Sequence, residues 1–215
     1  PRPEATKFLS LELMNRTSIN AALLPKTVTL SDNDIFYYPF LLMTGEGQFQ
    51  PFSKEERERL RLYLEQGGFL LIDNCEGMKD GPFDRCVRRE LAALFPDNPV
   101  TMLAMDHSIY RSFYLMREPY FGGRVRTVPY LEGISIDDVS PVIYCLNDMS
   151  GAWARNDRGE FAFDAIPGGE LQRQTAFKFG VNAVMYALTV NYKKDVVHVK
   201  ALLERGRYRK LPWTR

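Results

Sequence analysis

The 215-residue sequence is short of the residues that usually bind metals and form crosslinks, with 3 cysteines and 2 histidines. Cys75, Cys86 and Cys145 are odd in number and include no C-x-x-C pair, so they allow at most one disulfide and leave the redox compartment open. With only His107 and His198 beside them, no zinc site has a plausible ligand spacing. We therefore expect no bound metal and no cofactor.

Long apolar runs and a strong charge imbalance are also absent. No run reaches the roughly 18 apolar residues that a membrane-spanning helix needs. The formal net charge is +1, which argues against nucleic acid or a membrane surface as a partner. The charge is uneven, however, because residues 200–215 carry six basic side chains against Glu204. A basic tail of this kind is either a solvated terminus or a binding arm.

What remains has the composition of an ordinary globular domain, with 45% apolar and 26% charged residues. A chain of this length buries enough surface to need no crosslinks. The sequence begins with Pro1 rather than Met, which we interpret as a processed, trimmed or partial product.

Alternating strand and helix patterns predict an α/β fold with βαβ units and a parallel sheet. Residues 111–168 break this rhythm and predict an antiparallel extension around residues 140–146. After a final helix that ends near Val190, three valines favour a short extended segment. The expected strands are 26–30, 40–43 (buried on both faces), 69–72 and 100–104, the expected helices are 3–14, 54–66, 84–95 and 170–189, and the valines are Val196, Val197 and Val199.

Helix boundaries are marked by capping residues. Ser53 and Glu56 have the spacing of a capping box, in which each side chain bonds the other residue's amide. Gly67 suits the left-handed cap that ends this helix. Asp84 is expected to cap the next helix, and Pro96 to stop it.

In an open parallel sheet, ligands bind beyond the carboxyl ends of the strands. Three stretches are expected there: 44–49, 73–77 and 105–110. Gly45 and Gly47 permit a turn that presents amides to an anion, or they form a simple sharp turn.

Polar residues at these strand ends predict a possible ligand pocket. Asp73, Asn74 and Asp148 supply hydrogen-bonding groups, and Trp153 supplies a surface for stacking. The same acidic residues are equally suited to capping helices.

Cys75 follows a buried strand, at the turn where α/β enzymes hold a nucleophile. The acidic neighbours Asp73 and Glu76 would raise its pKa, which favours an inert thiol. His107 is the candidate partner base, although an imidazole bonded to a loop carbonyl is the alternative.

Six stretches resemble the bacterial family called domain of unknown function 4159, in the family's order from about residue 8 to residue 199. They are ELMNRTSI (12–19), FYYPFLLMTGEGQF (36–49), LRLYLEQGGFLLIDN (60–74), DHSIYRSFY (106–114), NDMSGAWAR (147–155) and FGVNAVMYALT (179–189). This family is similar to class I glutamine amidotransferase-like domains, so the resemblance implies a three-layer α/β/α, flavodoxin-like, doubly wound sheet.

The resemblance also bears on catalysis. In that superfamily the loop at TGEG forms an oxyanion hole, and the strand at FLLIDNC ends at the nucleophile. The superfamily's elbow reads G-x-C-x-G where this chain reads DNCEG, and its H-x-E is replaced by HVK at His198. The resemblance therefore implies the fold and weakens the case for an enzyme.

The domain organisation expected from the resemblance is one domain over residues 1–199, with an insertion-like extension at 111–168 and a basic tail at 200–215. Family members carry a strand before the first helix, so we expect a central strand upstream of Pro1. Relatives are often secreted or membrane-attached, which favours the periplasm over the cytoplasm.

Three functions are compatible with these features. The first is a non-catalytic binding or scaffolding domain in a bacterial envelope-associated assembly. The second is a hydrolase or amidotransferase that uses Cys75 with His107 or His198. The third is recognition of a sugar or polyol, because trehalose-utilisation-like proteins share the superfamily.

The C-terminal residues suggest contact with another protein chain. Tyr208 and Trp213 are interleaved with Arg207 and Arg209, a mixture that is enriched where proteins bind one another. We expect this tail to lie against a partner chain or against a groove of its own domain.

Overall fold

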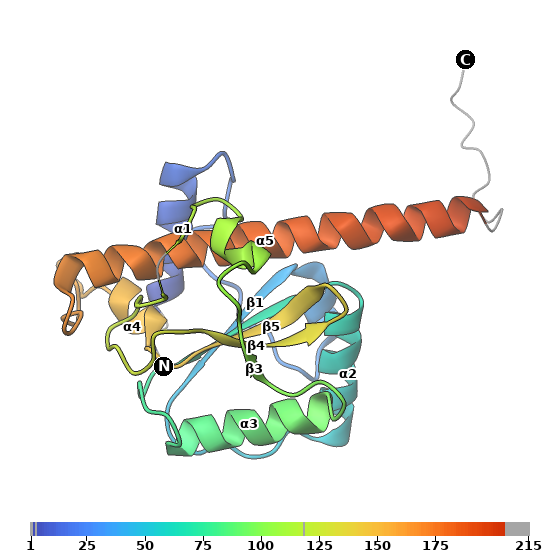
Figure 1. Ribbon diagram of the computed structural model, residues 1–215, viewed down its shortest axis with the longest axis horizontal. Helices are drawn as coiled ribbons and strands as arrows, with labels where there is room; N and C mark the ends of the chain where they lie inside the picture. The colour runs from blue at the N-terminus through green and yellow to red at the C-terminus, as the bar shows by residue number, and fades with distance from the viewer. Residues whose placement is uncertain (1, 3, 118, 205–215) are drawn as a thin grey trace.

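A computed structural model describes residues 2, 4–117 and 119–204, and within 190–204 it describes the backbone alone. Helices pack on both faces of a five-stranded sheet (Figure 1). The strands are β1 (Phe40–Gly45), β2 (Phe69–Asn74), β3 (Thr101–Met102), β4 (Glu132–Ile136) and β5 (Val139–Cys145). The helices are α1 (Ala5–Arg16), α2 (Lys54–Glu65), α3 (Pro82–Leu94), α4 (Met149–Trp153) and α5 (Gly169–Glu204), with short 3-10 helices η1 (Asn33–Tyr37) and η2 (Ser108–Arg111).

The strand order is β1-β2-β5-β4-β3. β2 pairs in parallel with β1 and β5, whereas β4 is antiparallel to β5 and β3. Four of the five strands therefore run in one direction, which confirms an α/β fold with a mostly parallel open sheet. β1 pairs with β2 directly, from Phe40↔Phe69 to Gly45↔Asn74.

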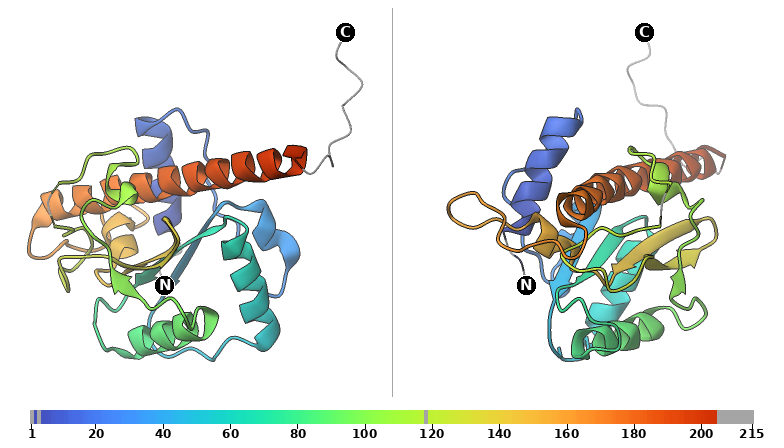
Figure 2. Two further views of the ribbon diagram at one scale, coloured as in Figure 1. Left: turned by 45° about the vertical axis from the view of Figure 1, so that its right-hand side comes forward. Right: turned by 60° about the vertical axis from the view of Figure 1, so that its left-hand side comes forward.

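β2 is buried along its whole length because both faces of the sheet are covered. Phe69 and Leu71 belong to the core cluster that includes residues of α1, α4 and α5. Leu70 and Ile72 belong to the cluster on the other face, with residues of α2 and α3. Figure 2 shows α5 on the opposite side of the sheet from α2 and α3. Side chains alternate along the strand, so this continuous apolar run fills two cores at once.

The predicted capping signals of α2 are confirmed. Ser53 Oγ accepts from the Glu56 amide at 3.2 Å, and the Glu56 carboxylate accepts from the Ser53 amide at 2.7 Å. At the other end, Gly67 has a φ of +104°, and the Gly68 amide donates to the Tyr63 carbonyl at 2.9 Å. These bonds satisfy backbone groups that the helix ends leave unpaired.

One strand prediction was wrong, and another was right in position but not in burial. Among the described residues, 26–30 form no strand. Instead, the side chains of Val28 and Leu30 are partly buried and pack against the core cluster that includes residues of α2 and α3. The strand expected at 40–43 is confirmed as β1, and both of its faces pack against a core cluster, but it is only half-buried because it lies at the edge of the sheet.

Two further predicted strands exist, but they differ from the prediction in length, position in the sheet or pairing direction. The segment 100–104 contributes only Thr101–Met102, exposed at the far edge and antiparallel to β4. The segment 140–146, which we assigned to an antiparallel extension, forms most of β5, a central strand parallel to β2. The antiparallel extension is β4 with β3. Sequence periodicity does not reveal which strands become neighbours, so these roles were not predictable.

Two helix predictions also need correction. α3 begins at Pro82 with Gly81 as its N-cap, and Asp84 accepts instead from the amide of Asp80 at 2.7 Å. α5 does not end near Val190 but continues to Glu204, so the valines expected in an extended segment lie in a helix. The chain has no glycine or proline between Gly180 and Gly206, so nothing interrupts the helical hydrogen bonds. Arg207, Tyr208, Arg209 and Trp213 lie outside the described residues.

No helix in the described part of the chain is both long and apolar enough to cross a membrane.

Candidate functional site

The carboxyl ends of β1, β2 and β5 meet at one edge of the sheet. Gly45 pairs with Asn74, and Asp73 pairs with Cys145, so the chain segments that follow these strands begin at similar heights. This arrangement brings together five of the predicted site residues. They are Gly45, Asp73, Asn74, Cys75 and Asp148.

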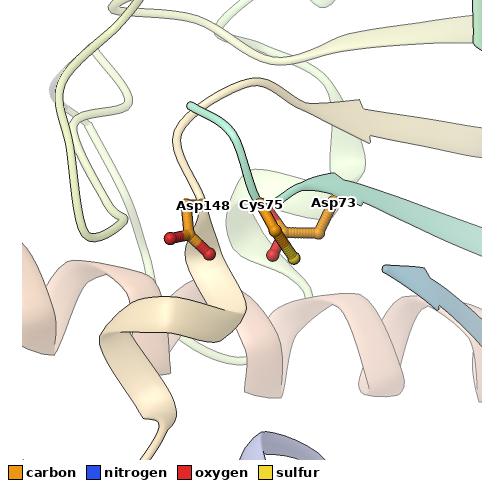
Figure 3. Close-up of side chains that lie close together, drawn as sticks. All are labelled: Asp73, Cys75 and Asp148. Carbon is orange, nitrogen blue, oxygen red and sulfur yellow. The ribbon is translucent and has the colours of Figure 1, made fainter. Parts of the chain in front are cut away.

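Asp73 lies at the end of β2, beside Cys75 and Asp148 (Figure 3). It is fully buried. One carboxylate oxygen accepts from the Met149 amide at 2.8 Å, and the other accepts from both the amide of Ser150, at 2.7 Å, and its hydroxyl. Asp73 thus caps the start of α4. Burial and the nearby Asp148 charge raise the pKa of Asp73 to about 6.

Asp148 closes the same end of α4 from the other side. It has a left-handed backbone with a φ of 49°, and its carboxylate accepts from the Gly151 amide at 2.9 Å. The same carboxylate pairs with the guanidinium of Arg124 and, at 3.2 Å, with that of Arg2. Sequence analysis assigned Asp148 to a pocket or a cap, and the structure shows a cap held by two arginines.

Cys75 follows β2 directly, and 1% of the residue is exposed. Its amide donates to the Gly45 carbonyl at 2.9 Å, and its sulfur lies 3.6 Å from the hydroxyl oxygen of Ser150. Burial, followed by the charge of Asp73, raises the pKa of the Cys75 thiol to about 11. The thiolate, which is the nucleophilic form, is therefore scarce at neutral pH.

Ligand atoms of Asp73, Cys75 and Asp148 lie within 4.8 Å of one another, which is close enough to hold a metal (Figure 3). Their existing partners argue against this role. Both carboxylates already accept from α4 amides. Arg124 adds a positive charge beside Asp148 and would repel a cation. Both carboxylates are therefore engaged by the chain's own amides and arginines.

The glycine loop after β1 binds an anion that belongs to the chain itself. Gly47, with a φ of +70°, donates its amide to the Glu76 carboxylate at 2.8 Å. The other oxygen of Glu76 accepts from the Phe83 amide, in the first turn of α3, at 3.2 Å. Asn74 supports the turn, since its side-chain oxygen accepts from the Glu76 amide at 2.9 Å. Sequence analysis missed this role of Glu76, for which the only signal was an acid between a strand and a helix start.

His107 lies too far from Cys75 to act as its base. Its Nε2 is 3.0 Å from the hydroxyl oxygen of Ser140, and its Nδ1 accepts from the Ile109 amide at 3.2 Å. Cys75 lies near Cys145, because Cys145 pairs with Asp73, two residues before Cys75. Ser140, which His107 contacts, lies five residues before Cys145 on β5, or about 16 Å away along the strand. Burial lowers the pKa of His107, which keeps the ring neutral. The side chain of His198 lies outside the described residues.

Trp153 lies inside the core rather than on a binding surface. It is fully buried, and its ring lies 6.3 Å from that of Phe177. A Cβ placed on Gly180 would come within 2.7 Å of the indole, so the helix backbone packs directly on it. No face of the indole is available for a sugar to stack on.

Besides the role of Glu76, sequence reasoning missed Ser150, Arg2 and Arg124. Arg2 and Arg124 are separated from Asp148 by 146 and 24 positions. No local pattern marks contacts of such separation.

The comparisons with known proteins give a family and no activity. The model of the family described as Domain of unknown function (DUF4159) matches residues 1–188. No curated protein matches the chain.

Proposed function

The chain belongs to this family of unknown function, and from that premise we propose that it is a non-catalytic binding or scaffolding domain. The observation that carries the proposal is that Cys75, at the position of a nucleophile, is not accessible and hydrogen-bonds to no base among the described residues. Cys75 is buried, its pKa is raised to about 11, and the nearest hydroxyl belongs to Ser150 rather than to a base. An active cysteine needs the opposite features, namely access, a lowered pKa and a base within hydrogen-bond reach.

The backbone amides at the same edge support this proposal. The Met149 and Ser150 amides bind Asp73, while the Gly47 and Phe83 amides bind Glu76. An oxyanion hole needs free donors aimed at the reacting atom. Here the chain's own carboxylates use these donors to fix loops and helix starts.

We propose that the binding partner contacts the end of α5 rather than the strand ends beside Cys75. α5 has 36 residues and is therefore about 54 Å long, and it extends past the sheet in Figure 1. The family match ends at residue 188, so the end of α5 lies beyond it. We propose that this end, with Arg207, Tyr208, Arg209 and Trp213 of the tail, contacts another protein chain.

The finer assignments follow the sequence resemblance. We propose an amidotransferase-like, flavodoxin-like domain in the bacterial periplasm, as a subunit of an envelope-associated assembly. Fractionation of the native host should then place the chain in the periplasm or with the envelope. Recovery from the cytoplasm alone would contradict this location.

The proposal is tested by purification from the native source under mild conditions, followed by size-exclusion chromatography with light scattering. We expect a second chain in fixed proportion. Cys75→Ser should leave the complex intact, while removal of residues 207–215 should weaken it and change the melting temperature by only a few degrees. A strictly monomeric chain, or a complex that needs the Cys75 thiol, would overturn the proposal.

A further inference from the structure

A surface hollow of about 450 Å³ lies between the loop after β1 and the start of α3. It is within the size range of small-molecule sites. It is also at the carboxyl end of a parallel strand, where open α/β sheets bind ligands. We call it the Arg85–Arg89 hollow; its lining residues are Gln48, Phe49, Gln50, Pro51, Pro82, Arg85, Cys86 and Arg89.

The lining contains two positive charges and no acidic residue. Arg85 and Arg89 are exposed and lie one turn apart on α3, a spacing at which like charges repel and destabilise a helix. Arg85 donates to the main-chain oxygen of Asp80, an uncharged acceptor, so no carboxylate partner balances its charge among the described residues.

Arg89 is only partly neutralised. It pairs with Glu90 at 2.8 Å, but Glu90 is buried and also accepts from Arg57 at 2.9 Å. Two guanidinium groups thus share one carboxylate. The lining residues themselves carry a formal charge of +2, and Glu90, which is not among them, offsets the charge of Arg89 only in part.

The walls of the hollow are held in place before any ligand arrives. The Phe49 ring lies 5.7 Å from that of Phe52 and 5.5 Å from that of Phe83. The Cys86 thiol donates to the Phe49 carbonyl at 3.6 Å and so joins the loop to α3. Fixed walls reduce the entropy that a ligand must overcome on binding.

From this geometry we propose that the Arg85–Arg89 hollow binds a small molecule that carries a carboxylate or phosphate group. Guanidinium groups form bidentate, charge-assisted hydrogen bonds with both. Gln48 and Gln50 are exposed at the rim and can bond the rest of the ligand. This site is separate from the contact with a protein partner and does not depend on it.

The test uses the full chain in thermal-shift and calorimetric titrations at constant ionic strength. Citrate probes carboxylate recognition, and pyrophosphate probes phosphate recognition. We expect saturable binding of at least one probe. Arg85→Gln should weaken it by about tenfold, the value of one lost charge-assisted bond. Arg158→Gln removes the same charge from an exposed position outside the lining and should leave the affinity unchanged.

Three results would overturn the proposal. The first is no saturable binding of either probe up to about 10 mM. The second is an equal loss of affinity in the Arg85→Gln and Arg158→Gln variants. The third comes from NMR titration of the natural chain, if the probe changes amide chemical shifts outside the loop 46–51 and α3. Each of them leaves the proposed binding of a protein partner unaffected, because that proposal is read from co-purification.

Discussion

The buried Asp73 carboxylate accepts hydrogen bonds from both the amide and the hydroxyl of Ser150, a residue 77 positions later in the chain. This contact joins the end of a central strand to the start of α4. It places a carboxyl group in the interior at the strand end, where open α/β sheets bind ligands. The edge of the sheet is therefore stabilised by internal hydrogen bonds.

The raised pKa of Asp73 predicts a pH-dependent stability. Between about pH 4 and about pH 6 the unfolded carboxyl is ionised while the folded one keeps its proton. The folded state binds more protons in this range, so the contribution of Asp73 to the free energy of unfolding falls as the pH rises. Above about pH 6 the loss is complete.

Asp73→Asn isolates this effect, because asparagine does not titrate. The difference in free energy of unfolding between the natural chain and this variant, measured in urea, should shrink from about pH 4 to about pH 6 and then stay constant. A difference that is constant or grows over this range would show that the pKa of Asp73 is not raised.

Cys75 should react slowly with iodoacetamide. Its thiol is buried and its pKa is raised to about 11, so at pH 8 the native chain should modify Cys75 no faster than Cys86 or Cys145. Mass spectrometry of digested samples gives the three rates, and unfolding in guanidinium provides the control in which all three react. Selective modification of Cys75 in the native chain would revive the enzyme hypothesis.

Glu76 should stabilise the loop after β1. Glu76→Ala removes the acceptor of the Gly47 and Phe83 amides and should cost about 1–2 kcal/mol. Hydrogen exchange of these two amides should accelerate. Glu76→Gln keeps one acceptor oxygen and should have a smaller effect. Unchanged exchange in the alanine variant would mean that Glu76 does not hold the loop.

Gly123 should tolerate no side chain. It has a φ of +141°, and a Cβ there would lie 2.1 Å from the Asn147 carbonyl oxygen. Gly123→Ala should destabilise the fold by more than about 3 kcal/mol, because backbone strain and a clash act together. Gly159→Ala is the matched control: its φ is +79° with no atom within 4 Å of the added Cβ, so only the strain of about 1 kcal/mol applies. Equal melting temperatures for the two variants would contradict this reading.

Local signals in the sequence determined the parts of the fold that depend on neighbouring residues. Ser53 and Glu56 marked the start of α2, and Gly67 marked its end, because caps and turns bond groups only a few positions apart. The run Phe69–Ile72 was recognised as a buried strand from its continuous apolar character. The acidic neighbour Asp73 already argued for a raised pKa of the Cys75 thiol, but in the structure burial is the larger cause and the charge of Asp73 the second.

Tertiary structure alone decided which of these elements meet. It made 140–146 a central parallel strand and brought Ser150, Arg124 and Arg2 to the carboxylates beside Cys75. It placed His107 against Ser140 and enclosed Trp153 in the core. These outcomes depend on contacts between residues far apart in the chain, which form only when the sheet assembles. Hydrophobic periodicity and capping patterns involve residues a few positions apart, so they do not predict such contacts.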